Sequence, residues 1–182
     1  MRKLIPFTVL AILLVVAGVA LAASAKHVYT YRSALTTAAA VPKPKGATAG
    51  KGAFTATVTE SGSTRTIKWK LTFSKLSGKA TMAHIHTGKR GVAGNVLIPL
   101  CGPCTSGQTG QTKISKDAAD LLESGRTYVN VHTAKNPAGE IRGQVNLIGE
   151  DGGGSGGSTG SQTTSPTVTD PMPDPGYTPP GY

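Results

Sequence analysis

The chain has 182 residues, among them 24 glycines and 12 prolines, and a net charge of +10 at neutral pH. Residues 26–148 hold 17 of its 19 basic residues but five of its nine acidic residues, so this segment alone carries a charge of +12. The flanking segments, 1–25 and 149–182, lack the composition of a folded core. The middle segment is long enough for one domain and too short for two, which excludes a large multi-domain enzyme.

The first 25 residues have the features of a signal peptide. Two basic residues at positions 2 and 3 precede an apolar run that extends to Ala23, and tripeptides ending at Ala22 and Ala25 each fit the small-residue cleavage pattern. The alternative is an uncleaved N-terminal anchor, because the apolar run is long enough to span a bilayer. Either outcome predicts a domain outside the cytoplasm, secreted or held in the cell envelope. A cleaved leader would leave no membrane span.

Between residues 27 and 148, apolar and polar residues alternate with a period of two, which is typical of half-buried strands. The clearest segment places Ile67, Trp69, Leu71 and Phe73 on one face, with threonine and lysine on the other. Glycine-containing turns separate nearly all of these segments. The expected strands cover residues 28–35, 54–58, 66–73, 81–87, 95–100, 109–114, 126–133 and 140–147.

One short helix is expected between residues 115 and 125. Ser115 is a suitable N-cap, Asp117 lies in the first turn, and Gly125 is expected to end the helix. Many short strands with a single helix predict an all-β fold, an antiparallel β-sandwich or barrel. The residues expected in its core are Trp69, Leu71, Phe73, Ile85, Val129 and Val131.

Residues 149–182 are expected to form a disordered tail. A Gly/Ser-rich stretch, 152–158, is followed by a Pro-rich one, 166–182. Neither stretch has the apolar content that a chain needs to fold alone.

Two cysteines, Cys101 and Cys104, are separated by a Gly-Pro pair. This C-x-x-C spacing matches a thioredoxin-type redox motif, in which a helix N-terminus lowers the pKa of the attacking thiol. Here the following residues, 105–110, have the composition of a loop. Export to an oxidising compartment therefore favours a structural disulfide over an oxidoreductase site.

Three of the four histidines lie on expected strands. His84 and His86 are two residues apart, so both rings leave the same face, opposite Ala83 and Ile85. His132 lies on the polar face of another strand. If these strands are neighbours, three imidazoles converge on a site for Zn²⁺ or Cu²⁺; if they are not, the histidines are ordinary surface residues. Because neutral imidazole is the form that binds a metal, the affinity is expected to fall below about pH 6.5.

Three further residues are candidates for supporting these histidines. Asn130 shares the face of His132, and the carboxylate of Glu140 is a candidate for fixing the tautomer of a ring. Arg142 is expected to pair with Glu140 or to attract small anions. The sequence contains no P-loop, nucleophile elbow, H-E-x-x-H motif or Gly-rich dinucleotide turn, so no catalytic residues are assigned.

The positive charge of the middle segment suggests polyanionic partners, such as wall or envelope polymers, although dispersed surface charge also serves solubility. Nucleic acid is not expected as a partner. The leader directs the chain out of the cytoplasm, and no aromatic residues cluster among the basic ones.

Several segments resemble the CHRD domain, a module named from chordin that is also found in many exported bacterial proteins. The matching segments are Ala83-His84-Ile85-His86, the loop from Leu100 to Gly107, Tyr128-Val129-Asn130-Val131-His132-Thr133 and Asn136-Pro137-Ala138-Gly139-Glu140-Ile141-Arg142-Gly143-Gln144. The resemblance covers residues 28–148, and the domain is placed at 26–148. One departure is Ala40, which precedes Val41-Pro42 where the family usually has an acidic residue.

The resemblance implies an immunoglobulin-like β-barrel with distant similarity to copper/zinc superoxide dismutases. In that comparison His84, His86 and His132 would occupy copper-like positions. A His-rich, Asp-containing zinc loop is missing, so the resemblance implies at most a mononuclear site. Two functions remain open: a non-enzymatic envelope module that binds or structures a partner, and, alternatively, a mononuclear copper- or zinc-binding protein with dismutase-like properties.

Overall fold

The structure is a computed structural model that describes residues 26–46 and 49–152. The expected leader, 1–25, lies outside the described residues, and so do residues 153–182 of the expected tail. Within the described part of the chain, no helix is both long enough and apolar enough to cross a membrane.

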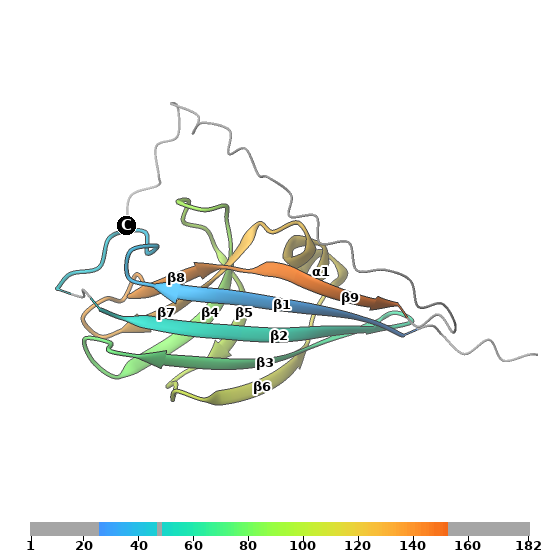
Figure 1. Cartoon of the computed structure of the whole chain (residues 1–182), viewed down its shortest axis with the longest axis horizontal. Coiled ribbons are helices and arrows are strands. Elements are labelled where there is room, and N and C mark those ends of the chain that lie inside the picture. The colour runs from blue at the N-terminus through green and yellow to red at the C-terminus, as the bar shows by residue number, and fades with distance from the viewer. Residues whose placement is uncertain (1–25, 47–48, 153–182) are drawn as a thin grey trace, which may run out of the picture.

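Nine strands and one short helix follow one another along the described residues (Figure 1). The elements are β1 (Lys26–Thr36), β2 (Lys51–Ser61), β3 (Thr64–Ser74), β4 (Ala80–Thr87), β5 (Val96–Cys101), β6 (Gln108–Lys113), α1 (Lys116–Glu123), β7 (Thr127–Thr133), β8 (Ile141–Gln144) and β9 (Asn146–Gly152). The strands form one antiparallel sheet in the order β5-β4-β7-β8-β1-β2-β3-β6, with β9 also paired to β1. The expected fold class is therefore confirmed: an all-β, nearly closed, barrel-like sheet with one short helix.

The three longest strands, β1, β2 and β3, pair along their whole length. β2 and β3 form a hairpin in which Ser61 pairs with Thr64, leaving two residues for the turn. Gly62 in this turn has a φ of +57°, which a residue without a Cβ adopts at little cost.

β1 joins the two halves of the sheet. Its first part pairs with β9, whereas Thr36 at its end pairs with Arg142 of β8. The apolar faces of β4, β7 and β8 therefore turn toward those of β1, β2 and β3 and share one core. Ile85, Val129 and Val131 on one side and Leu71 on the other are fully buried in this core. Burial of these alternating side chains supplies the main favourable free energy of folding.

The structure differs from the sequence-based expectations in two places. Phe73, expected in the core, is half-buried because it lies near the end of β3 at the rim of the sheet. The single strand expected at 140–147 is two strands, β8 and β9, which are separated at the buried Val145. The ordered chain continues through β9 to Gly152, beyond the expected domain boundary at 148.

The helix forms where the sequence predicts it. The hydroxyl of Ser115 accepts a hydrogen bond from the backbone N–H of Ala118 at 3.2 Å, which caps the N-terminus of α1. Gly125 follows the helix with a φ of +66°. Ala118, Ala119 and Leu122 form the buried side.

Candidate metal centre

The strands that carry the three histidines are direct neighbours. β4 pairs with β7 in an antiparallel register that sets His84 opposite Asn130 and Met82 opposite His132. His84, His86 and His132 therefore lie on one face of adjacent strands, the face opposite Ile85 and the core. This answers the question that the sequence leaves open, namely whether the third histidine is near the first two.

The three rings converge. Each ring contributes one nitrogen to a set of three, and these three nitrogens all lie within 4.8 Å of one another. The closest pair is Nδ1 of His84 and Nε2 of His132, at 3.3 Å. The centroid of the His84 ring lies 5.1 Å from that of the His132 ring and 5.5 Å from that of the His86 ring. Metal–nitrogen bonds to imidazole are about 2 Å long, so two nitrogens bound to one ion lie at most about 4 Å apart. Small rotations of the rings would bring nitrogens that now lie up to 4.8 Å apart to the spacing that one ion requires.

Loops cover the polar face of β7, whereas the polar face of β4 is partly open at Met82, which is 43% exposed. His86 and His132 are 8% and 6% exposed, and His84 is half-buried. Every residue of β7 is buried, because loops 88–95 and 134–140 lie over the face that is opposite the core. The period of two identifies the two faces but not the loops that close over one of them.

Backbone carbonyl groups fix the orientation of two rings. Nδ1 of His132 lies 2.8 Å from the carbonyl oxygen of Pro137, and Nδ1 of His86 lies 3.0 Å from that of Gly94. A carbonyl oxygen accepts hydrogen bonds and cannot donate them, so each Nδ1 carries the proton and each Nε2 carries a lone pair. Nε2 of His86 is buried and has no hydrogen-bond partner among the described residues. A buried lone pair of this kind fits a metal ligand.

The environment keeps the rings neutral. Burial lowers the pKa of His84 to about 4, with further lowering from the nearby rings of His132 and His86. Burial also lowers the pKa of His86 and His132, against the opposing effect of their carbonyl partners. Metal binding requires neutral imidazole, so the binding-competent form persists to a lower pH than the value of about 6.5 expected from the sequence alone.

We expect the stability of the metal-free domain to fall as the pH drops from about 6.5 to about 4. An imidazole in the unfolded chain takes up a proton near pH 6.5, whereas folded His84 does so at about 4. Between these values the unfolded state binds more protons, so the free energy of unfolding decreases with decreasing pH. Urea unfolding at several pH values measures the slope, which His84→Gln should reduce. An unchanged slope in this variant, or His84 titrating near 6.5 by NMR, would contradict the prediction.

The carboxylate of Glu140 does not contact a histidine ring, although the sequence suggested that role. It is fully buried and accepts hydrogen bonds from Ser77, Thr133 and Asn136 at 2.5–3.1 Å. Burial alone would raise the pKa of this carboxyl, but these hydrogen bonds lower it below its ordinary value. Glu140 therefore acts on the site indirectly, because Asn136 begins the segment that presents the Pro137 carbonyl to His132.

Asn130 supports the same loop. It lies on the face of the histidines, as expected, and its Nδ2 donates to the carbonyl oxygen of Ala138 at 3.0 Å. Gly139 has a φ of +120°, and a Cβ there would lie 2.2 Å from the amide of Asn130. Only glycine at this position allows the loop to pack against Asn130 and still deliver the Pro137 carbonyl.

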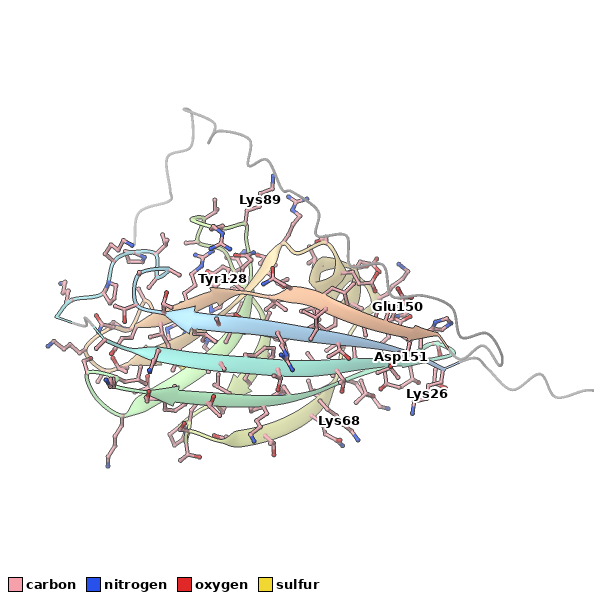
Figure 2. All side chains as sticks on the ribbon, in the orientation of Figure 1. Lys26, Lys68, Lys89, Tyr128, Glu150 and Asp151 are labelled. Atoms are coloured by element: carbon pink, nitrogen blue, oxygen red, sulfur yellow. A yellow bond between two sulfur atoms is a disulfide. The ribbon has the colours of Figure 1, made fainter. Side chains whose placement is uncertain are left out.

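Arg142 anchors the other loop and does not pair with Glu140. Its Nη2 donates to the carbonyl oxygens of Lys89 and Val92, each at 2.8 Å. Its guanidinium lies 3.4 Å above the centre of the Tyr128 ring. Figure 2 shows Tyr128 below the loop that carries Lys89. Arg142 thus holds loop 88–95, which supplies the Gly94 carbonyl to His86.

Tyr128 is also part of the site, although it was not among the residues predicted from the sequence. The ring of His86 stacks on that of Tyr128, with centroids 5.0 Å apart and planes 9° from parallel. The Tyr128 hydroxyl accepts a hydrogen bond from the Gly94 N–H at 3.1 Å. Its two-residue spacing from Asn130 is a signal that could have placed it on this face. No sequence signal could have identified the carbonyl groups of Gly94 and Pro137, because every residue has a backbone carbonyl group.

Cys101 and Cys104 form a disulfide, as expected, with Cα atoms 5.3 Å apart. Cys101 ends β5, and residues 102–107 form a loop and turn before β6. No helix begins at this motif, so the structure lacks the helix N-terminus that activates a thiol in redox sites.

Comparison with protein-family models gives a match to the CHRD domain over residues 31–145, which contain the three histidines, both loops and the disulfide. A search of curated proteins and a search of solved structures give no match. The similarity to dismutases stays a prediction. The family match extends over more than half of the 182 residues, from β1 to the end of β8. This chain therefore belongs to the CHRD domain family.

Proposed function

We propose that this CHRD domain is an extracytoplasmic module that binds one transition-metal ion, Cu²⁺ in preference to Zn²⁺, through His84, His86 and His132. The observation that carries the proposal is the convergence of three ring nitrogens within 4.8 Å of one another. The leader, with its basic start and apolar run, supports the location outside the cytoplasm.

The donor set supports this choice of metal. Imidazole nitrogen suits both copper and zinc, and a given set of nitrogen ligands binds Cu²⁺ more tightly than Zn²⁺ in the usual order of stabilities. Nε2 of His86 and Nε2 of His132 are the free nitrogens of rings whose Nδ1 is held by a carbonyl, and Nδ1 of His84 faces them. In the metal-free protein, His84 Nδ1–H is able to donate to His132 Nε2. A bound cation would replace this shared proton.

The three histidines do not surround the ion completely. His84 is the most exposed of the three, so the open side of the site lies next to its ring. Water or a small ligand would complete the coordination there. The proposed role is binding, as in a carrier or a metal-dependent envelope module, and it assigns no reaction to the domain.

Calorimetric titration of the metal-free protein with Cu²⁺ and with Zn²⁺ at about pH 7 tests the proposal. The expected result is one ion per chain, with the tighter binding for Cu²⁺. His84→Ala and His132→Ala should each weaken binding at least 100-fold, since loss of a supporting residue alone typically costs 10- to 100-fold. Electron paramagnetic resonance of the Cu²⁺ form should show coupling to imidazole nitrogen, and this coupling should change in both variants.

His27→Ala is the matched control. His27 lies on β1, which does not pair with β4 or β7, and it should not affect the high-affinity site. Copper can also bind near a free chain terminus, and this variant removes the histidine that would support such binding. Absent binding, or binding that is lost in His27→Ala and kept in His132→Ala, would overturn the proposal.

A further inference from the structure

The outer face of β1, β2, β3 and β6 is a second candidate site, separate from the histidines. It lines a shallow hollow of about 680 Å³. The inner face of these strands packs into the shared core, so this outer face and the histidine face point away from each other. Nothing in the metal proposal uses this surface.

The register of the four strands arranges the side chains of this face in rows. In one row, Arg32 pairs with Thr55, Thr55 with Lys70, and Lys70 with Thr109. Arg32, Thr55 and Lys70 project outward because each alternates with buried neighbours along its strand. Thr109 of β6 projects outward because it pairs with Lys70. All four are exposed.

The adjacent row has the same composition. Thr57 of β2 pairs with Lys68 of β3, which pairs with Gln111 of β6. Lys68 and Lys70 are thus about 7 Å apart along one strand, and Arg32 is about 10 Å from Lys70 across two strands. Three cations lie within one small area, separated by hydroxyl and amide groups that can donate and accept hydrogen bonds.

No carboxylate lines the hollow. Among the residues that the structure describes, ion pairs form between Arg65 and Glu60 and between Lys116 and Asp120, and neither involves this face. Acidic residues are concentrated elsewhere: three lie on α1, and Glu150 and Asp151 lie at the end of β9 (Figure 2). Asp151 pairs with Val28, so it shares the outward face of β1 but lies four residues along the strand from Arg32, outside the hollow. The positive charge of this face is therefore not neutralised by the protein's own described side chains.

We propose that this face binds an acidic polysaccharide, a chain of sugars bearing carboxylate or sulfate groups. Charge complementarity comes from Arg32, Lys68 and Lys70, and the threonine hydroxyls suit the hydroxyl groups of sugars. Trp69 is the one aromatic residue that lines the hollow, but its side chain is buried on the inner face of β3. No outward aromatic ring is therefore available for stacking nucleic-acid bases. The attraction acts between exposed charges and weakens as salt screens them.

Binding to immobilised heparin and polygalacturonate tests this proposal, with neutral dextran and single-stranded DNA as comparisons. The Lys68→Gln/Lys70→Gln double variant should lose about 10-fold in affinity for both acidic polysaccharides, as expected for two exposed charge contacts. The matched control is Lys43→Gln/Lys45→Gln, which removes the same charge at the same spacing from the exposed loop before β2. The control variant should bind within about 2-fold of the unchanged protein, and dextran should not bind.

Three results would overturn the proposal. An equal loss in the control variant would show that the whole charge of the protein attracts polyanions without a defined face. Single-stranded DNA binding at least as tightly as the polysaccharides would assign the face to another polymer. No binding at low salt would remove the site altogether. None of these results bears on metal binding, which is measured separately.

Discussion

Replacing Trp69 by alanine is expected to lower the free energy of unfolding of the domain by about 3–5 kcal/mol, the usual range for removing a buried aromatic side chain. Trp69 is 6% exposed and lies on the inner face of β3, between Ala56 of β2 and Gly110 of β6. A Cβ at Gly110 would lie 2.4 Å from Cζ2 of Trp69, so the indole lies directly over this glycine. No residue of β6 is itself buried, and the strand therefore depends on the indole for its apolar cover.

Urea unfolding followed by circular dichroism measures this loss, because the chain has one tryptophan and the variant has no indole fluorescence. Amide hydrogen exchange should accelerate most in Gln108–Lys113, the strand that the indole covers. Trp69→Phe keeps an aromatic ring over Gly110 and should lose clearly less stability. A loss below about 1 kcal/mol in Trp69→Ala would contradict the observed register of β3.

Replacing Glu140 by alanine is expected to destabilise the domain by at least about 3 kcal/mol and to weaken metal binding about 10- to 100-fold. The carboxylate accepts four hydrogen bonds from three residues, Ser77, Thr133 and Asn136. Ser77 is exposed, but Thr133 and Asn136 are buried, so loss of the carboxylate leaves their side-chain donors without this acceptor. The effect on metal binding follows because Asn136 lies next to Pro137, whose carbonyl orients His132. Glu140→Gln preserves the shape but not the charge, and should give intermediate effects.

Ser77→Ala separates the two effects of this network. It removes the hydroxyl that donates to Glu140 and accepts from Asn136 at 3.3 Å, but Asn136 keeps its bonds to Thr133 and Glu140. The variant should therefore cost about 1 kcal/mol of stability and weaken metal binding much less than Glu140→Ala does. Unfolding in urea and calorimetric titration with Cu²⁺ are measured on the same preparations. Full metal affinity in folded Glu140→Gln and Glu140→Ala proteins would show that the network does not position His132.

The alternation of residues along the chain contains most of the information about the fold. Ile85, Val129 and Val131 were identified as core from their two-residue spacing, and all three are fully buried. Ser115 and Gly125 bound the helix as expected, because capping and positive φ depend on the identities of single residues. The prediction that Phe73 is buried was wrong, because this side chain is only half-buried. Spacing indicates which face a side chain occupies but not how near it lies to the rim of the sheet.

The sequence also determined, without any structure, that His84 and His86 share a face, because covalent geometry alternates side chains along every strand. Tertiary structure decided the rest of the candidate site. His132 is 48 residues from His84 in the sequence, and their strands pair because that arrangement buries the apolar faces of both halves of the sheet together. Similarly, the carbonyl groups of Gly94 and Pro137 reach the rings because Arg142, Asn130 and Glu140 hold their loops in place. Spacing along a strand is a local property, whereas strand neighbours and loop positions follow from burial and hydrogen bonding summed over the whole domain.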